Sequence, residues 1–190
     1  MVLPPVLTTI SSTNKNIINN SNNINSNKEL LTLAKKVISA SYYSSLSSSS
    51  NYNYQKERDE IISQNIINKW GEQFSPVFVT SYSKKPLISR NVWCCMSNGD
   101  YEGKNTVVNN VIESAKICAT LDSRRNLNGV LPSYITISIL APKNRWIKRR
   151  NIQELSREKM KAIYLVTNNN NAIYLPSVWE EREEWSAKDL

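Results

Sequence analysis

Two adjacent cysteines, Cys94 and Cys95, are the side chains with the clearest capacity for chemistry. The surrounding residues 92–96 are typical of a strand, in which neighbouring side chains point to opposite faces. Cys94 then shares a face with apolar neighbours, which predicts a small, buried core residue. Cys95 shares the other face with Trp93 and Ser97. It is the candidate catalytic residue, because a partly exposed thiol beside a cation can become a nucleophilic thiolate, but we rank a structural role above that one.

Three cysteines and no histidine restrict the chemistry available to the chain. The third cysteine, Cys118, falls on the apolar stripe of an expected helix and is predicted to lie in the core. An odd number of cysteines, two of them adjacent, is not typical of a disulfide framework, so we expect reduced thiols. The lack of histidine excludes His-based catalytic triads and His-ligated zinc, and three thiols do not complete a four-ligand zinc site. We therefore expect neither a metal nor a cofactor.

Two pairs of polar residues lie near the two ends of a segment, residues 104–125, that is expected to form a helix. Asp122 and Arg124, at its end, are candidate binding residues, although a carboxylate and a guanidinium so placed more often fix a loop by hydrogen bonds. Asp100 and Glu102 precede it in the loop NGDYEGKN. They could form a carboxylate pair for acid–base catalysis, but we expect a solvated turn.

Positive charge is concentrated in one short stretch, residues 143–150, which we call the basic segment. Its five cations surround one aromatic residue, and all six are candidate binding residues: Lys143, Arg145, Trp146, Lys148, Arg149 and Arg150. Cations contact phosphates and an aromatic ring can stack on a base, so the segment is a candidate for binding nucleic acid or phosphate. The alternative is a solvated basic loop, faced by the acidic residues near the C-terminus.

Apolar periodicity predicts the elements that position these residues. Helical spacing covers residues 28–41, 56–70 and 104–125, and strand-like runs cover residues 76–83, 86–96 and 133–140. In the last strand, Ile135, Ile137 and Ile139 share one face. Residues 162–167 and 172–176 predict a hairpin. Helices mixed with hairpin-like strand pairs, rather than alternating βαβ units, indicate the α+β class.

The domain is expected to span residues 28–190, with a loop insertion at about 41–56. Residues 1–27 are predicted to form a disordered tail, because their Asn- and Ser-rich stretch offers too little apolar surface to fold. No run approaches the ~20 apolar residues of a membrane span. Pro4 and Pro5 also interrupt the only N-terminal apolar run. We expect a cytoplasmic protein without membrane contact, and leave a nuclear or organellar location open.

Five segments, in order, carry a resemblance to a known family: ELLTLAKKVIS (29–39), SPVFVTSYSKKPL (75–87), VIESAKICATLDSR (111–124), LPSYITISILAP (131–142) and AIYLPSVWEE (172–181). The chain resembles the AMMECR domain family over most of residues 28–189. That family has a Leu-Arg-Gly-Cys-Ile-Gly hallmark, and residues 92–97 keep only its cysteine, as Cys95. The resemblance implies a two-lobed α+β domain with an antiparallel or mixed sheet and flanking helices. In prokaryotes it also implies association with Memo-like and radical-SAM partners, but it supplies no reaction.

The function expected from these features is binding, to a protein partner that the sequence does not identify, with a degenerate cysteine site. One alternative is an enzyme, or an enzyme accessory component, that uses the Cys95 thiol. Another is an RNA- or phosphate-binding module that acts through the basic segment.

Overall fold

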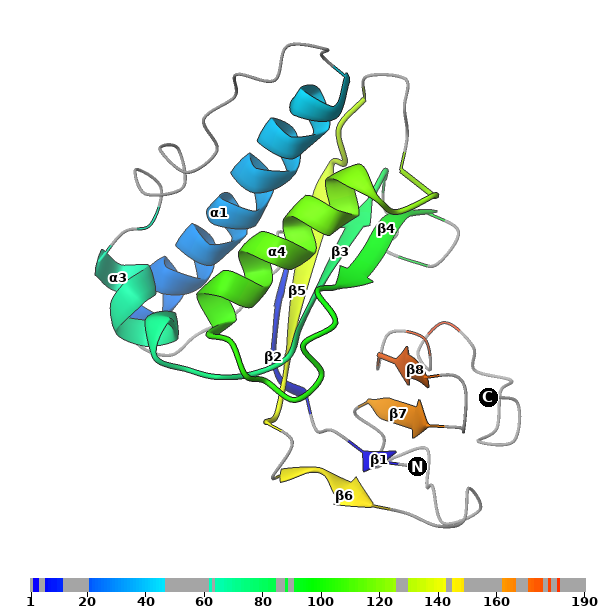
Figure 1. Ribbon diagram of the computed structural model, residues 1–190. Helices are drawn as coiled ribbons and strands as arrows, with labels where there is room; N and C mark the ends of the chain where they lie inside the picture. The colour runs from blue at the N-terminus through cyan, green and yellow to red at the C-terminus, as the bar shows by residue number, and fades with distance from the viewer. Residues whose placement is uncertain are drawn as a thin grey trace.

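The computed structural model describes residues 2–3, 6–11, 21–46, 62, 64–84, 88, 91–125, 130–142, 145–148, 162–166, 171–175, 178 and 181. These residues form an α+β fold with two four-stranded sheets and two long helices (Figure 1). The expected fold class is therefore confirmed.

The central sheet has the strand order β2 (Val6–Ser11), β5 (Tyr134–Leu140), β3 (Val77–Tyr82) and β4 (Val92–Ser97). Every neighbouring pair in it is antiparallel. In β5, Ile135, Ile137 and Ile139 are all buried in the main core, as their alternation predicts. The apolar face of β5 thus orients this strand toward the main core.

Two helices, α1 (Ser21–Leu46) and α4 (Val107–Thr120), cover one face of the central sheet (Figure 1). Their apolar stripes supply much of the main core, including Leu33, Val111 and Cys118. The side chain of Thr106 caps α4 by accepting a hydrogen bond from the Asn109 N–H at 3.3 Å. A short helix, α3 (Gln64–Ile66), runs into a π-helical turn at Ile67–Gly71.

The second sheet has the order β6 (Ile147–Lys148), β1 (Val2–Leu3), β7 (Ile163–Val166) and β8 (Asn171–Tyr174). β7 and β8 form the antiparallel hairpin that the sequence predicts. A smaller buried cluster joins the two sheets. It contains Phe78 and Leu140 from the central sheet with Ala162 and Leu175 from beside the hairpin. The face of the central sheet that the helices leave uncovered therefore packs toward the second sheet.

The N-terminal residues take a different form from the disordered tail expected over residues 1–27. Val2–Leu3 pairs with β6 and β7, Val6–Ser11 pairs with β5, and α1 already begins at Ser21. A strand is held by its backbone hydrogen bonds, so the open edge of β5 can order a segment whose own sequence predicts little. Residues 12–20 lie outside the described ranges, as does most of the predicted insertion.

Strand β4 contains a bulge at Trp93. Ser81 pairs with Cys94 and Tyr82 pairs with Val92, so Trp93 has no partner opposite it. The extra residue turns the indole into the helix-facing core, where its ring lies 5.7 Å from that of Tyr42. The prediction that Trp93 shares a face with Cys95 is therefore wrong, because a bulge interrupts strict alternation.

Candidate functional site

The Cys95 side chain lies on the face of β4 that looks toward the second sheet. It is partly buried against the smaller apolar cluster, and its Sγ lies 3.2 Å from the hydroxyl oxygen of Thr80 on β3. Burial raises the pKa of the Cys95 thiol, although the Thr80 hydrogen bond and the positive charge of Arg124 act in the opposite direction. A reactive cysteine needs a lowered thiol pKa, which requires that the effect of a nearby cation or helix terminus be larger than the effect of burial. The surroundings of Cys95 thus favour the neutral thiol.

The side chains of Asp122 and Arg124 form hydrogen bonds with the backbone of Cys95. The Cys95 N–H donates to Asp122 Oδ2 at 3.3 Å, and Arg124 Nη2 donates to the Cys95 carbonyl at 3.1 Å. The two side chains also bond to each other, with Nε to Oδ1 at 3.0 Å and Nη2 to Oδ2 at 2.6 Å. We call this arrangement the Asp122–Arg124 clamp. It occupies backbone groups on the outer edge of β4 that would otherwise be open to pairing.

The clamp keeps Asp122 ionised. Burial alone would raise its pKa, but the hydrogen bonds and charge of Arg124, with the Cys95 N–H, together lower the pKa of Asp122 below its ordinary value. Asp122 is almost fully buried while half of the Arg124 side chain is exposed. The structure therefore brings together three residues that were candidates from the sequence, Cys95, Asp122 and Arg124. Their hydrogen bonds stabilise the edge strand β4.

Cys94 and Cys118 form a disulfide, with their Cα atoms 5.7 Å apart. Both side chains are fully buried, as predicted, but the expectation of reduced thiols is wrong. Cys94 points from β4 toward the helices and Cys118 points from α4 toward the sheet, so the fold brings them to bonding distance. Counting cysteines did not reveal this, because the pairing depends on how α4 packs against β4. Cys95 is the free cysteine.

The basic segment is described in part. Arg145 is exposed, Trp146 is half-buried, and Lys148 lies on β6. Lys143, Arg149 and Arg150 lie outside the described residues. The Trp146 indole N–H donates to the carbonyl of Ala141 at 2.6 Å, which fixes the ring at the end of β5.

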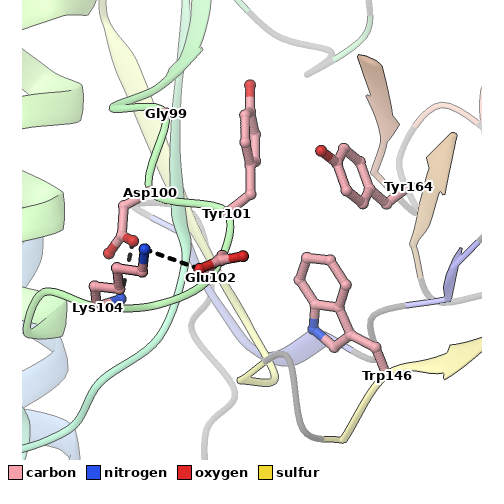
Figure 2. Close-up of a pocket in the computed structure, with 7 residues that line it drawn as sticks. All are labelled: Gly99, Asp100, Tyr101, Glu102, Lys104, Trp146 and Tyr164. Atoms are coloured by element: carbon pink, nitrogen blue, oxygen red, sulfur yellow. Dashed lines mark hydrogen bonds and ion pairs between the residues drawn. The ribbon is translucent and has the colours of Figure 1, made fainter. Parts of the chain in front are cut away.

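Trp146 forms one wall of a cavity of about 380 Å³, which we call the aromatic pocket (Figure 2). The lining residues come from the β4–α4 loop, from the residue before β6 and from β7: Gly99, Asp100, Tyr101, Glu102, Lys104, Trp146 and Tyr164. Tyr101 and Tyr164 stack with ring centroids 5.4 Å apart and an interplanar angle of 23°. Trp146 stands nearly perpendicular to Tyr164, at 5.5 Å and 72°. The pocket therefore has aromatic walls on one side and charged groups on the other.

The charged side of the pocket is built by a loop between β4 and α4, residues 98–106, which we call the pocket loop. Asp100 organises this loop by accepting hydrogen bonds from the backbone N–H groups of Lys104 and Asn105, each at 2.9 Å. Asn110, which is fully buried, donates to the same carboxylate at 2.9 Å. Burial tends to raise the pKa of Asp100, but these hydrogen bonds outweigh it and lower the pKa. Asp100 thus shapes the loop rather than forming the acid–base pair considered for it.

Glu102 and Lys104 form an ion pair at 2.9 Å at the mouth of the pocket. The hydrogen bond and charge of Glu102 raise the pKa of Lys104, so its ammonium stays protonated throughout the physiological range. In Figure 2 the Glu102 carboxylate points toward the space enclosed by Tyr101, Tyr164 and Trp146. The pocket thus offers aromatic faces, an acceptor group and a cation within one small volume.

Sequence reasoning missed Tyr101 and Tyr164 as site residues. Each is a single tyrosine in a short segment, and nothing in the spacing of the chain relates them to Trp146. The available signal was local. Gly99 and Gly103 flank Asp100 and Glu102, and glycines at such spacing mark a loop with a defined backbone path.

Within the described part of the chain, no three His, Cys, Asp or Glu side chains gather closely enough to hold a metal ion. Of the helices that the structure describes, none has the length and apolarity needed to cross a bilayer.

The five segments that resemble the AMMECR family fall on α1, β3, α4, β5 and β8. Their order along the chain thus follows the main elements of the fold, and the family assignment stays a prediction from sequence. No protein-family profile, curated protein or solved structure matches this chain.

Proposed function

We propose that this chain is a divergent AMMECR-type domain that acts by binding, and that its ligand is single-stranded nucleic acid. In this proposal the aromatic pocket stacks a base while the basic segment contacts the flanking phosphates. The observation that carries it is the meeting of Trp146, from the basic segment, with Tyr101 and Tyr164 around a cavity of about 380 Å³. Volumes of this order suit a small organic ligand.

Stacking suits these residues for a physical reason. Every base has a π-face, so aromatic walls bind bases with little dependence on sequence, and each stacked base contributes about 1–3 kcal/mol. The chain carries a net charge of +8, with nine Lys and Arg against two acidic residues over residues 104–150. Such an excess attracts a polyanion and gives binding that weakens with salt.

The thiol-enzyme alternative receives less support from the site. It needs Cys95 as a thiolate near neutral pH, whereas burial raises the pKa of this thiol. The residues best placed to assist it, Asp122 and Arg124, bond to each other and to the Cys95 backbone. A binding function does not require Cys95 to be a thiolate.

Fluorescence anisotropy with an end-labelled, mixed-sequence RNA of eight nucleotides tests the proposal. Trp146→Ala and Tyr164→Ala should each weaken binding by about 5- to 150-fold, which corresponds to the loss of one stacked base. Tyr43→Ala is the matched control, because Tyr43 is an exposed aromatic residue on α1, at 54% exposure, away from the second sheet. Equal affinities for all four proteins, or no binding of RNA or DNA by the unaltered chain, would overturn the proposal.

Salt dependence supplies an independent test of the basic segment. Each phosphate contact to a single strand contributes about −0.7 to the slope of log affinity against log salt. Replacing Arg145 and Lys148 with glutamine should therefore flatten the slope by about 1.4. The control replaces Lys35 and Lys36, two exposed lysines on α1, and should leave the slope unchanged. An unaltered slope in the first variant would remove the basic segment from the binding site.

A further inference from the structure

We infer that Phe74 is a second stacking platform, which binds another base of the same strand that occupies the aromatic pocket. This inference rests on the proposed nucleic-acid function, and it adds that the ligand is a strand of several nucleotides rather than a single nucleotide. It is carried by the place of one exposed phenylalanine beside the pocket loop.

Phe74 is an aromatic residue with a large exposed surface. Its side chain is 54% exposed, and it belongs to neither of the two buried clusters that the structure describes. Single exposed apolar residues are common on protein surfaces, so exposure alone does not indicate a role. What distinguishes Phe74 is its position relative to the aromatic pocket.

The backbone of Phe74 is attached to the C-terminal end of the pocket loop. Phe74 pairs with Thr106 in an isolated antiparallel bridge, and the Val107 N–H donates to the Gln73 carbonyl at 2.7 Å. Neither of these two contacts uses the phenylalanine ring. The ring is therefore held in one place while more than half of its surface is open to a ligand.

The residues after Phe74 connect this segment to the centre of the pocket loop. The Asn110 amide donates to the Ser75 carbonyl at 2.8 Å and to the Asp100 carboxylate at 2.9 Å, so one fully buried side chain holds both segments. Gly103 also packs so closely that a Cβ atom there would lie 3.1 Å from the Cα of Ser75. Residues 73–76 and the pocket loop thus pack as one unit, which fixes Phe74 relative to the pocket.

The distance from the pocket to Phe74 suits a short single strand. Lys104 lines the pocket, and Thr106, opposite Phe74, follows it on the same loop. Two residues span at most about 7 Å, and the Cα atoms of opposite residues are at most about 5.5 Å apart, so the Cα atoms of Lys104 and Phe74 lie within about 13 Å. A stacked strand rises about 3.4 Å per nucleotide, so about four nucleotides cover this distance.

A cation lies between the two stacking sites. Along the pocket loop, Lys104 comes between Tyr101, which lines the pocket, and Thr106 (Figure 2), and its side chain is 76% exposed. Proteins that bind single strands combine cations, which contact the backbone, with aromatic rings, on which successive bases stack. The pocket, Lys104 and Phe74 provide this combination over a few nucleotides.

Fluorescence anisotropy at low salt, with the end-labelled RNA of eight nucleotides, tests this inference. Phe74→Ala should weaken binding by about 5- to 150-fold, which is the effect of losing one stacked base. Phe74→Leu keeps an apolar side chain but has no aromatic face, so it should also bind weakly. Phe74→Tyr keeps the face and should bind at least about fivefold more tightly than Phe74→Leu. Tyr43→Ala is the matched control, because Tyr43 on α1 is equally exposed, at 54%, and should not affect binding.

A double variant separates stacking on Phe74 from an indirect effect on the pocket. If the two sites stack different bases, the fold losses caused by Phe74→Ala and Trp146→Ala should multiply to within about twofold. If Phe74 only supported the pocket loop, Phe74→Ala would weaken the Trp146→Ala variant no further, and that result would overturn the inference.

The remaining outcomes distinguish the inference from the proposed function. Equal affinities of Phe74→Ala and the unaltered chain, with Trp146→Ala weakened, would overturn the inference while the proposed function stands. Equal affinities of Phe74→Leu and Phe74→Tyr would show an apolar contact in place of stacking, and would overturn the inference as well. Absence of RNA binding by the unaltered chain would overturn the proposed function.

Discussion

Replacing Gly103 with alanine should destabilise the pocket loop, and the structure allows the size of the effect to be worked out. Gly103 has φ +68°, a left-handed conformation that other residues adopt at a cost of about 1–2 kcal/mol. A Cβ atom there would also lie 3.0 Å from Pro76 Cδ and 3.1 Å from the Cα of Ser75. The second contact is with backbone, which cannot rotate away as a side chain can. Overpacking of this kind costs a further ~1–3 kcal/mol.

Gly99 provides a matched control within the same loop. Its φ is +80°, but a Cβ atom there would meet nothing within 4 Å. Alanine also restricts the unfolded chain at both positions, which offsets about 0.4–1 kcal/mol of the loss. We therefore expect Gly99→Ala to lower the free energy of unfolding by about 0–1.5 kcal/mol and Gly103→Ala by about 1–4.5 kcal/mol. The difference between the two variants isolates the steric contribution.

Urea denaturation of the two variants and the unaltered chain measures this difference, provided that the slope of unfolding free energy against urea is the same for all three. Gly103→Ala should also weaken RNA binding, since Tyr101 and Glu102 lie on the same loop. Equal destabilisation by the two substitutions would mean that the pocket loop does not approach Ser75 and Pro76 as described, and would refute the reasoning.

Three further predictions concern the clamp and the cysteines. Asp122→Asn should lower the free energy of unfolding by about 1–3 kcal/mol at pH 7. Because the folded-state pKa of Asp122 lies below its unfolded value, that contribution is present above about pH 4 and is lost as the pH falls through the folded pKa. The difference in urea midpoint between the variant and the unaltered chain should thus be full near neutral pH and should shrink as the pH falls below about 4, and a difference that does not change with pH would contradict the clamp. The Cys94–Cys118 disulfide spans a sequence separation of 24, so its reduction should lower stability by about 3–4 kcal/mol. Thiol titration of the unfolded, unreduced chain should find a single reactive cysteine, whereas three would disprove the bond. That cysteine, Cys95, should react slowly with iodoacetamide in the folded protein at pH 7.5, and rapid labelling would restore the thiol-enzyme alternative.

Local periodicity was enough to predict the main elements of this fold. The alternation of Ile135, Ile137 and Ile139 identified both the strand and its buried face. The apolar stripe that includes Cys118 likewise oriented α4 toward the sheet. In each case the pattern is repeated over a whole element, and burial of that pattern dominates the energetics.

The features that sequence reasoning missed depend on partners far away along the chain. Strand β2 exists because the edge of β5 is open, and the disulfide exists because α4 brings Cys118 beside Cys94. The bulge at Trp93 interrupts the alternation of side chains along β4. It arises from the pairing of β4 with β3, and no residue in the segment indicates it. The aromatic pocket also depends on residues that are distant along the chain. Trp146 was a candidate because of its basic neighbours, whereas the tyrosines that complete the pocket come from separate elements.

Photo-crosslinking tests the central claim, nucleic-acid binding in the aromatic pocket, most directly. A single-stranded RNA containing one 4-thiouridine is irradiated with the full chain, and the attachment site is mapped by mass spectrometry. We predict crosslinks in the peptides that contain Tyr101, Trp146 or Tyr164, because these rings form the pocket walls. The crosslinks should be lost in Trp146→Ala and retained in Tyr43→Ala. Crosslinks confined to α1, or their absence at RNA concentrations that saturate binding, would contradict the account.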